Sequence, residues 1–335
     1  MSALFERQQV LKFQEVGDLI FIAESLKVPF GRLIKRAKKP VQTLAEWPGQ
    51  VYSAHGFGGT MDGTDHTSYE HTTREKLEAY VMIQRTKGWQ ATKLANLTRT
   101  AGVKKSEMAK QMADDGIHLS QQMERQFLSD MDTQVEAPPG TPYQSRGGFS
   151  WLSDTAQTTK PVPAALRPAA ANHYTGTLAN FTPAALEAML ESMSMEKKSP
   201  VDLENVCGIK LKSKMSSWMA HDADVAGETV TRQYNLDASE KKFEQIVDFF
   251  KFDSGSLRNL VSYFILCDEA DGANSLKTPR SGLLFDRDMW ELAYMQNPHH
   301  FEQEDKGAGP RGFHDAVYML KCLNPLGQGT IQISS

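Results

Sequence analysis

Residues 31–71 read GRLIKRAKKPVQTLAEWPGQVYSAHGFGGTMDGTDHTSYEH, and this polar stretch decides the predicted fold. It has few consecutive hydrophobic residues and is rich in Gly, Thr and His. A segment of this composition buries too little apolar surface to fold alone, and a loop this long inside a compact domain is either disordered or leaning on another molecule. The stretch therefore predicts a segment that leans on another molecule, which points to assembly before it points to chemistry.

Two strands are expected to flank the glycine-rich part of this stretch. Weak alternation predicts one strand over residues 41–47, and apolar residues alternating with charged ones predict another over residues 74–94. The glycines at 56, 58, 59 and 63 predict a turn between them. We therefore expect residues 33–85 to form a long hairpin. An isolated two-stranded ribbon is marginally stable in water, so this hairpin needs a partner surface.

A long amphipathic helix is predicted over residues 106–132. Glu107 lies in its first turn, where a carboxylate opposes the positive end of the helix dipole. At ~1.5 Å per residue the helix is expected to be about 39 Å long. The apolar residues lie near one stripe at helical spacing, namely Met108, Met112, Leu119, Met123, Phe127 and Met131. We interpret this stripe as a packing face rather than a ligand groove.

The remaining chain predicts a mixture of helices and strands. Residues 133–176 are rich in Pro, Gly, Ala and Ser and predict an irregular connection. Thr182 and Pro183 then predict a helix start, and Lys197, Lys198 and Pro200 its end. Further elements are expected as a strand at 206–209, a helix at 212–220, strands within 230–266, an element at 283–295 that ends at Asn297-Pro298, and a last strand at 316–323.

Composition narrows the possible functions. The chain has 335 residues and a formal net charge of -4, which argues against a dedicated nucleic-acid binder. Its three cysteines are far apart and form no disulfide or zinc pattern. The first residues carry charges where a signal peptide needs an apolar run, and no apolar run is long enough to span a membrane. We expect a protein made and kept in the cytoplasm.

The sequence carries only weak patterns for catalytic, cofactor-binding or metal-binding sites. GAGPRG at 307–312 has the spacing of a dinucleotide loop, but a strand rather than a helix is expected after it. Two polar clusters are interpreted as solvated loops rather than metal sites: His299, His300, Glu302, Glu304 and Asp305, and Asp62, Asp65, His66 and His71. We assign no catalytic, cofactor-binding or metal-binding residue, expect no cofactor, and expect that the protein is not an enzyme.

Several segments, in their order and spacing, carry a family resemblance. They are VPFGRLIKRAKKPVQTLAEW, KLEAYVMIQRTKGWQATKLANLTRTAG, RGGFSWL, EQIVDFFKFDSGSL, LLFDRDMWELAYMQNP and GFHDAVYMLKCLNPLGQGTI. Over most of its length the chain resembles the major capsid proteins of tailed bacteriophages with the Hong Kong 97 capsid fold.

The resemblance implies an α+β fold with a defined domain order. It implies an N-terminal arm at 1–30 and an extended β-hairpin loop at 31–75. A peripheral domain would span 76–150 and 314–330, with a spine helix at 106–132. An irregular connection would follow at 151–175 and an α/β axial domain at 176–313.

The function implied is that of a structural subunit of an icosahedral phage head. Such a subunit would self-assemble into hexamers and pentamers around double-stranded DNA, with no membrane involved. The implied partners are other copies of the chain, a portal protein, a scaffolding protein and a decoration protein. Assembly would take place in the host bacterial cytoplasm and the product would be the virion. The alternative is another virion protein or a nucleic-acid-associated assembly protein.

Nine residues are candidates for contact between subunits: Arg32, Lys35, Arg36, Lys38, Lys39, Trp47, His55, Phe57 and Arg74. The five basic residues up to Lys39 have three interpretations, namely a solvated face, pairing with acidic residues of a neighbouring subunit, or contact with packaged DNA. Trp47 is expected either to anchor an interface or to belong to the local core.

Overall fold

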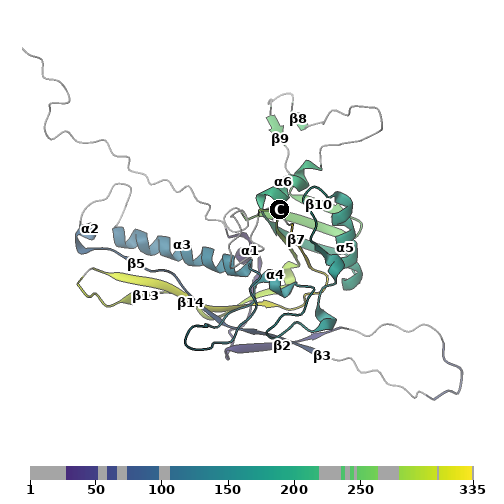
Figure 1. Ribbon diagram of the computed structural model, residues 1–335, viewed down its shortest axis with the longest axis horizontal. Helices are drawn as coiled ribbons and strands as arrows, with labels where there is room; N and C mark the ends of the chain where they lie inside the picture. Colours follow the sequence, from purple (N-terminus) through teal and green to yellow (C-terminus); the bar gives the residue numbers. More distant parts are fainter. Residues whose placement is uncertain are drawn as a thin grey trace, which may run out of the picture.

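A computed structural model describes residues 28–51, 59–65, 74–97, 106–218, 235–237, 242–244, 247–262, 279–307 and 309–333. Figure 1 shows a long sheet with one long helix along it, a second sheet flanked by shorter helices, and a separate two-stranded hairpin. The described part of the chain therefore combines helices and sheets in the way that the α+β prediction requires.

The predicted hairpin is present. Strand β2 (Leu44–Gln50) pairs antiparallel with β3 (Arg74–Tyr80), so that Leu44 lies opposite Tyr80 and Gln50 opposite Arg74. The second strand is shorter than predicted. The region to residue 94 also holds β4 (Met82–Arg85), β5 (Trp89–Gln90) and the start of helix α2 (Lys93–Leu97). Gly88 has a left-handed φ of 81°, which interrupts the extended chain between β4 and β5.

The long sheet has the order β1 (Lys35–Arg36), β13 (Trp290–Gln303), β14 (Arg311–Cys322) and β4, and β5 also pairs with β14. Contrary to prediction, β13 continues through Asn297-Pro298. Its register against β14 shifts between Tyr294 and His299, and such an irregularity accommodates a proline that cannot donate to the ladder.

Helix α3 (Glu107–Phe127) begins as predicted. Ser106 caps it by accepting a hydrogen bond from the Ala109 backbone N–H at 3.2 Å. The predicted end at residue 132 is wrong, because the helix stops at Phe127. The Ser129 hydroxyl then donates to the Gln126 carbonyl at 2.7 Å, and the chain turns away. Met131 therefore does not lie on the helical stripe, whereas Leu119, Met123 and Phe127 are buried.

The second sheet has the order β10 (Phe249–Phe252), β11 (Gly255–Val261), β7 (Val201–Cys207), β12 (Gly282–Phe285), β15 (Gly329–Ile331) and β6 (His173–Tyr174). Helix α5 (Pro183–Lys197) has the predicted Thr182 cap and ends at Lys198, whose φ is 54°. Helix α6 (Ile209–Ser217) starts earlier than predicted, and β7 also precedes its predicted position. Strands β8 (Asn235–Asp237) and β9 (Lys242–Glu244) form a separate pair, and most of 219–246 lies outside the described residues.

Strand pairing differs from the expected domain boundaries. Strand β1 of the expected loop 31–75 lies in the long sheet, and β6 of the expected connection 151–175 lies in the second sheet. Strand β13 lies in the long sheet although it falls within 176–313, and β15 lies in the second sheet although most of it falls within 314–330. The short 3-10 helix η4 (Arg287–Met289), capped by the Asp286 side chain, redirects the chain between the sheets. Gly327, with a φ of 70°, lies on the return path.

Residues 151–175 form an irregular connection that packs onto the hairpin. It follows helix α4 (Gly148–Trp151) and contains two 3-10 helices, η2 (Ala164–Leu166) and η3 (Ala170–Asn172). Leu166 is buried and lies over Gly49 of β2, where a Cβ atom would stand 2.4 Å from a Leu166 methyl carbon. The connection therefore covers one strand of the hairpin where the hairpin joins the body.

The two sheets and α3 meet at Phe30, in helix α1 (Pro29–Leu33). Its ring centroid lies 4.8 Å from that of Phe285, 5.6 Å from Trp290 and 6.1 Å from Phe127. The Glu124 carboxylate accepts hydrogen bonds from the Phe30 and Gly31 backbone N–H groups, both at 2.7 Å. These bonds fix the start of the hairpin segment to α3. Burial raises the pKa of Glu124 to about 7, although both hydrogen bonds act to lower it.

Replacing Glu124 with Ala should destabilise the folded protein by about 2–4 kcal/mol, because two buried backbone N–H groups lose their acceptors. The measurement is urea unfolding followed by far-UV circular dichroism. The matched control is Glu187→Ala on the exposed face of α5, which should change the free energy of unfolding by no more than about 0.5 kcal/mol. Equal effects of the two substitutions would contradict the role given to Glu124.

Glu124 should also make stability depend on pH. Its pKa rises from an ordinary 4.5 to about 7 on folding, so the folded subunit holds this proton more tightly. The stabilisation is complete below pH 4.5 and is lost as the pH rises through 7. We expect a contribution of about 3 kcal/mol. The unfolding free energy of the wild type should fall more steeply over this window than that of Glu124→Gln. Parallel profiles would refute the assignment.

Candidate assembly surfaces

The basic residues predicted as contacts do not form one continuous surface. Lys35 pairs with Asp288 (Nζ to Oδ1, 2.8 Å), and the Arg36 guanidinium lies over the Tyr294 ring at 5.4 Å. Both partners belong to the same subunit. Arg32, Lys38 and Lys39 are exposed.

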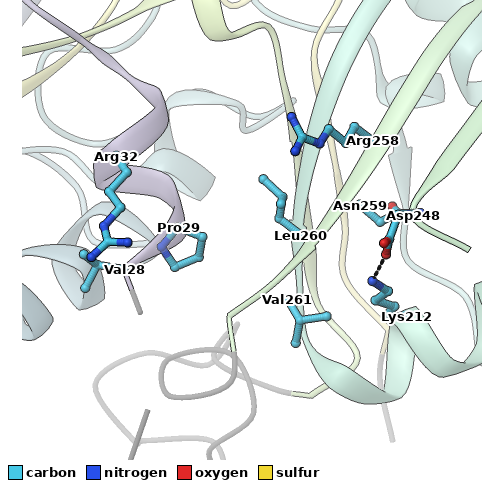
Figure 2. A pocket seen from close by; sticks show the side chains of 9 residues that line it. All are labelled: Val28, Pro29, Arg32, Lys212, Asp248, Arg258, Asn259, Leu260 and Val261. Atoms are coloured by element: carbon cyan, nitrogen blue, oxygen red, sulfur yellow. Dashed lines mark hydrogen bonds and ion pairs between the residues drawn. The ribbon is translucent and has the colours of Figure 1, made fainter. Parts of the chain in front are cut away.

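Arg32 lies at a cavity of about 380 Å³ between α1 and the second sheet. Figure 2 shows Val28, Pro29 and Arg32 on one side and Arg258, Asn259 and Lys212 among the residues on the other. Lys212 pairs with Asp248, and Arg258 lies 3.8 Å from the Glu204 carboxylate. The two cations across the cavity from the exposed Arg32 therefore already have carboxylates beside them. Sequence reasoning missed Arg258 and Lys212 because only tertiary packing brings them near Arg32.

Trp47 packs against the core of its own subunit. Its indole N–H donates to the Cys322 carbonyl at 3.0 Å, and its ring centroid lies 5.6 Å from that of Trp151. The Lys321 ammonium lies over the ring at 5.4 Å. The structure thus gives Trp47 the local contacts of the second interpretation, and contact with a neighbouring subunit stays a prediction.

The rest of the hairpin presents polar and apolar groups to its surroundings. Arg74 is exposed at the far end of β3, while His55 and Phe57 lie outside the described residues. Met61, in the loop between the strands, is 84% exposed, and Val41 before β2 is also exposed. Apolar side chains this exposed are candidates for burial against another molecule.

A second group of exposed apolar residues lies at the other end of the molecule. Leu94 and Leu97 of α2 are exposed, and Phe301 of β13 is 51% exposed. Figure 1 places α2 and the adjoining end of the β13–β14 ribbon far from the hairpin. The subunit therefore carries uncovered apolar groups at both ends of its long axis.

Three members of the first polar cluster weighed in the sequence have internal partners, namely His299, His300 and Asp305. His299 pairs with Asp315 at 2.8 Å, and the Trp89 indole N–H donates to His300 at 3.1 Å. Asp305 accepts hydrogen bonds from the Gly307 and Gly309 N–H groups, which holds the glycine-rich loop before β14. Asp62 and Asp65 are exposed, whereas His66 and His71 fall outside the described residues.

Among the residues that the structure describes, no group of three His, Cys, Asp or Glu side chains is arranged to hold a metal ion. Within the same residues, no helix has the length and apolar character required to cross a membrane.

The chain is similar to known capsid proteins in its sequence family and in its fold. A family model described as SU10 major capsid protein matches residues 4–333. The mature capsid of bacteriophage PhiM1 is similar with a TM-score of 0.61 at 11% identity, covering 98% of this chain and 92% of that chain. The capsid of cyanophage P-SCSP1u gives 0.60 at 10% identity, with coverage of 99% and 97%. The capsid of a native GTA particle gives 0.59 at 9% identity, with coverage of 98% for both chains. No curated protein matches the sequence.

The structural similarity concerns the fold, since the identities are low. It covers nearly the whole chain and confirms the predicted Hong Kong 97 capsid fold.

Substitution of Trp47 should distinguish its local contacts from a contact between subunits. Trp47→Phe keeps the ring packing but loses the hydrogen bond to Cys322, so the unassembled subunit should lose about 1 kcal/mol. Trp47→Ala also removes the packing against Trp151 and should cost about 3 kcal/mol. Denaturant unfolding measures both values. Unchanged subunit stability combined with loss of assembly would assign Trp47 to an interface instead.

Proposed function

The chain belongs to the SU10 major capsid protein family and is a structural subunit of a phage head shell, and from this premise we propose that its copies form hexamers and pentamers that close into an icosahedral shell around double-stranded DNA. The family match sets aside the alternative of another virion or nucleic-acid-associated assembly protein. We assign the protein no reaction.

The hairpin is the observation that carries the proposal. Among the strands that the structure describes, β2 and β3 pair with each other and with no third strand, and residues 51–73 connect them in the sequence. A two-stranded ribbon gains stability when a surface covers it. We infer that the hairpin lies across a neighbouring subunit in the shell, with the exposed Met61 and Arg74 among its contacts. His55 and Phe57 belong to the same proposed contact region.

The exposed basic residues have a separate role in this proposal. Arg32, Lys38 and Lys39 pair with acidic groups of a neighbouring copy, since charge complementarity fixes the register of an interface. Lys35 and Arg36 hold the segment that carries these residues against the body, through their intramolecular contacts with Asp288 and Tyr294. Contact with the packaged DNA is the second possibility, and a steep loss of binding with added salt would identify it.

The two sheets correspond to the proposed domains. The long sheet with α3 forms the peripheral domain, and the second sheet with α5 and α6 forms the axial domain around the capsomer centre. The observed pairing modifies the boundaries, since β13 joins the peripheral sheet and β15 the axial one. Residues 1–27 of the expected arm 1–30 lie outside the described part, and its last residue, Phe30, belongs to the core of the subunit.

Weak contacts between many copies explain how such a shell becomes stable. Each subunit offers modest apolar groups at both ends, and closure of the shell multiplies these contacts without strong affinity for any one pair. A portal protein, a scaffolding protein and a decoration protein are the further partners that we propose. Assembly takes place in the cytoplasm of the bacterial host.

Replacing residues 51–73 with an Asn-Gly turn should leave the subunit folded but prevent closed, heat-resistant shells. This change keeps β2 and β3 and favours a two-residue hairpin turn. Expression of the full chain followed by electron microscopy gives the product, and circular dichroism of the unassembled material tests the fold. Shells of wild-type diameter that survive heating as the wild type does would show that the loop is not a clamp.

A further inference from the structure

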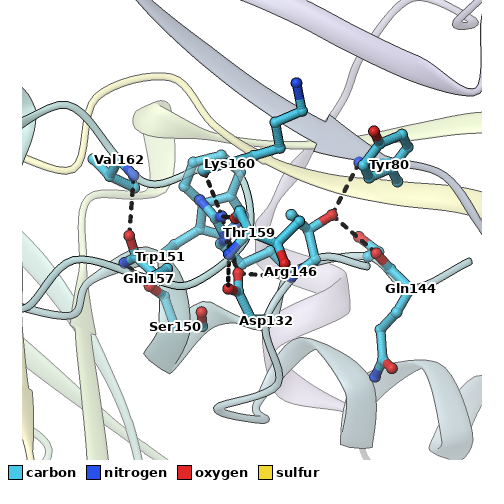
Figure 3. A network of polar contacts seen from close by, with 12 residues as sticks. Tyr80, Asp132, Gln144, Arg146, Ser150, Trp151, Gln157, Thr159, Lys160 and Val162 are labelled. Atoms are coloured by element: carbon cyan, nitrogen blue, oxygen red, sulfur yellow. Dashed lines mark hydrogen bonds and ion pairs between the residues drawn. The ribbon is translucent and has the colours of Figure 1, made fainter. Parts of the chain in front are cut away.

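Arg146 is the most deeply buried cation that the described residues contain. Its side chain is 1% exposed. Its Nε donates to Asp132 Oδ1 at 3.0 Å, and the same carboxylate oxygen lies 2.9 Å from Nη2 in an ion pair. Nη2 also donates to the Thr159 and Lys160 carbonyls, both at 2.7 Å. The guanidinium lies over the Trp151 ring at 4.6 Å. Figure 3 shows that one side chain thereby joins three separate stretches of chain.

The residues that Arg146 holds are the ones that touch the hairpin. The Lys160 ammonium lies 3.0 Å from Glu78 Oε2 on β3. Thr133, next to Asp132, accepts a hydrogen bond from the Tyr80 backbone N–H at 3.1 Å. On the other strand, Trp47 packs against Trp151. Both strands of the hairpin therefore rest on groups that Arg146 orients.

The backbone conformation of Lys160 indicates that surrounding contacts hold this residue in place. Its φ is 51°, a left-handed value that is unfavourable for a lysine and persists only where surrounding contacts determine it. The bond from Arg146 to the Lys160 carbonyl is such a contact. Burial acts to raise the pKa of Glu78, but hydrogen bonds from Lys160 and Lys76 outweigh it and the pKa is lowered. The ion pair to Lys160 is therefore maintained near neutral pH.

A small rotation of the hairpin at its contacts with the Arg146 network displaces the far end of the hairpin. The seven residues of β2 extend about 23 Å, so a rotation of about 10° at one end displaces the other by about 4 Å. A displacement of that size exceeds what a hydrogen bond tolerates. A hairpin that contacts a neighbouring subunit therefore needs a fixed direction, which its own two strands do not supply.

We propose that Arg146 is a positioning residue for shell assembly, which acts through Lys160 and Trp151 to fix the direction in which the β2–β3 hairpin leaves the subunit. The inference rests on the proposed function, in which the hairpin contacts a neighbouring copy. Arg146 itself contacts no other subunit in this scheme.

The decisive variant is Lys160→Met, which removes the ion pair to Glu78 but leaves the Arg146 contacts to the backbone intact. The matched control is Lys198→Met, because Lys198 is also a lysine with a left-handed φ and is exposed on α5's C-terminal end. Arg146→Lys keeps the buried charge but loses the fork that reaches three acceptors. The exchange Glu78→Lys with Lys160→Glu restores the ion pair in reverse.

Two measurements on the full chain separate positioning from stability. Spin labels at Gln50→Cys, which is exposed opposite Arg74, and at Glu187→Cys report the distance from hairpin to body by pulsed electron resonance. The background is Cys267→Ser, since Cys207 and Cys322 are buried. Electron microscopy counts closed shells. We expect Lys160→Met and Arg146→Lys to broaden the distance distribution and to reduce closed shells roughly tenfold, since the defect repeats in every copy. Lys198→Met should match the wild type, and the charge exchange should recover both readouts.

The outcomes also distinguish this inference from the proposed function. Narrow distances and normal shells for Lys160→Met would overturn the positioning role. If Arg146→Lys fails to fold, the Lys160→Met result still decides. If the wild-type chain formed no shells, the proposed function would fail, while the distance distributions would still test whether this network directs the hairpin. A loss of shells with unchanged distances would place Lys160 in a contact between subunits and would also overturn the inference.

Discussion

The two hydrogen bonds from the Phe30 and Gly31 backbone to Glu124 are the constraint on which the subunit depends. They bind the start of the hairpin segment to α3 while the Phe30 ring touches both sheets through Phe285 and Trp290. A buried carboxylate is costly unless it is hydrogen-bonded. Here it satisfies two N–H groups of α1, which is too short to stand by itself. The junction of the two sheets with α3 is thus specified by polar as well as apolar contacts.

The subunit combines this tightly packed centre with ends that carry exposed apolar side chains. Around Phe30, Trp151 and Trp290 the side chains are fully buried, whereas Met61 at one end and Leu97 at the other are each 84% exposed. The Arg146 network lies between the buried centre and the hairpin. Through Lys160 and Trp151 it connects the core to both hairpin strands. A shell subunit needs both properties, because a rigid body defines geometry and uncovered ends give contacts that form only with copies of itself.

Local signals in the sequence predicted the elements that local physics determines. The cap at Ser106, the Thr182-Pro183 start of α5 and the pairing of β2 with β3 all follow from neighbouring residues. Contacts between distant residues were not predictable from one sequence. Nothing near Glu124 or Arg146 indicates their partners, and Pro298 gave a misleading stop signal because a register shift absorbs it. The basic residues were found by charge alone, which did not reveal that Lys35 and Arg36 are engaged within the subunit.

The large sequence separation between β14 and its partners has a consequence for biosynthesis. This strand pairs with β4 and β5, covers α3, and supplies through Cys322 the carbonyl that binds Trp47. Contacts of such large sequence separation form late and slow the folding of a domain. A growing polypeptide on the ribosome lacks this strand until long after β2 and β3 have been synthesised. The hairpin therefore has no finished base in a nascent chain before β14 emerges.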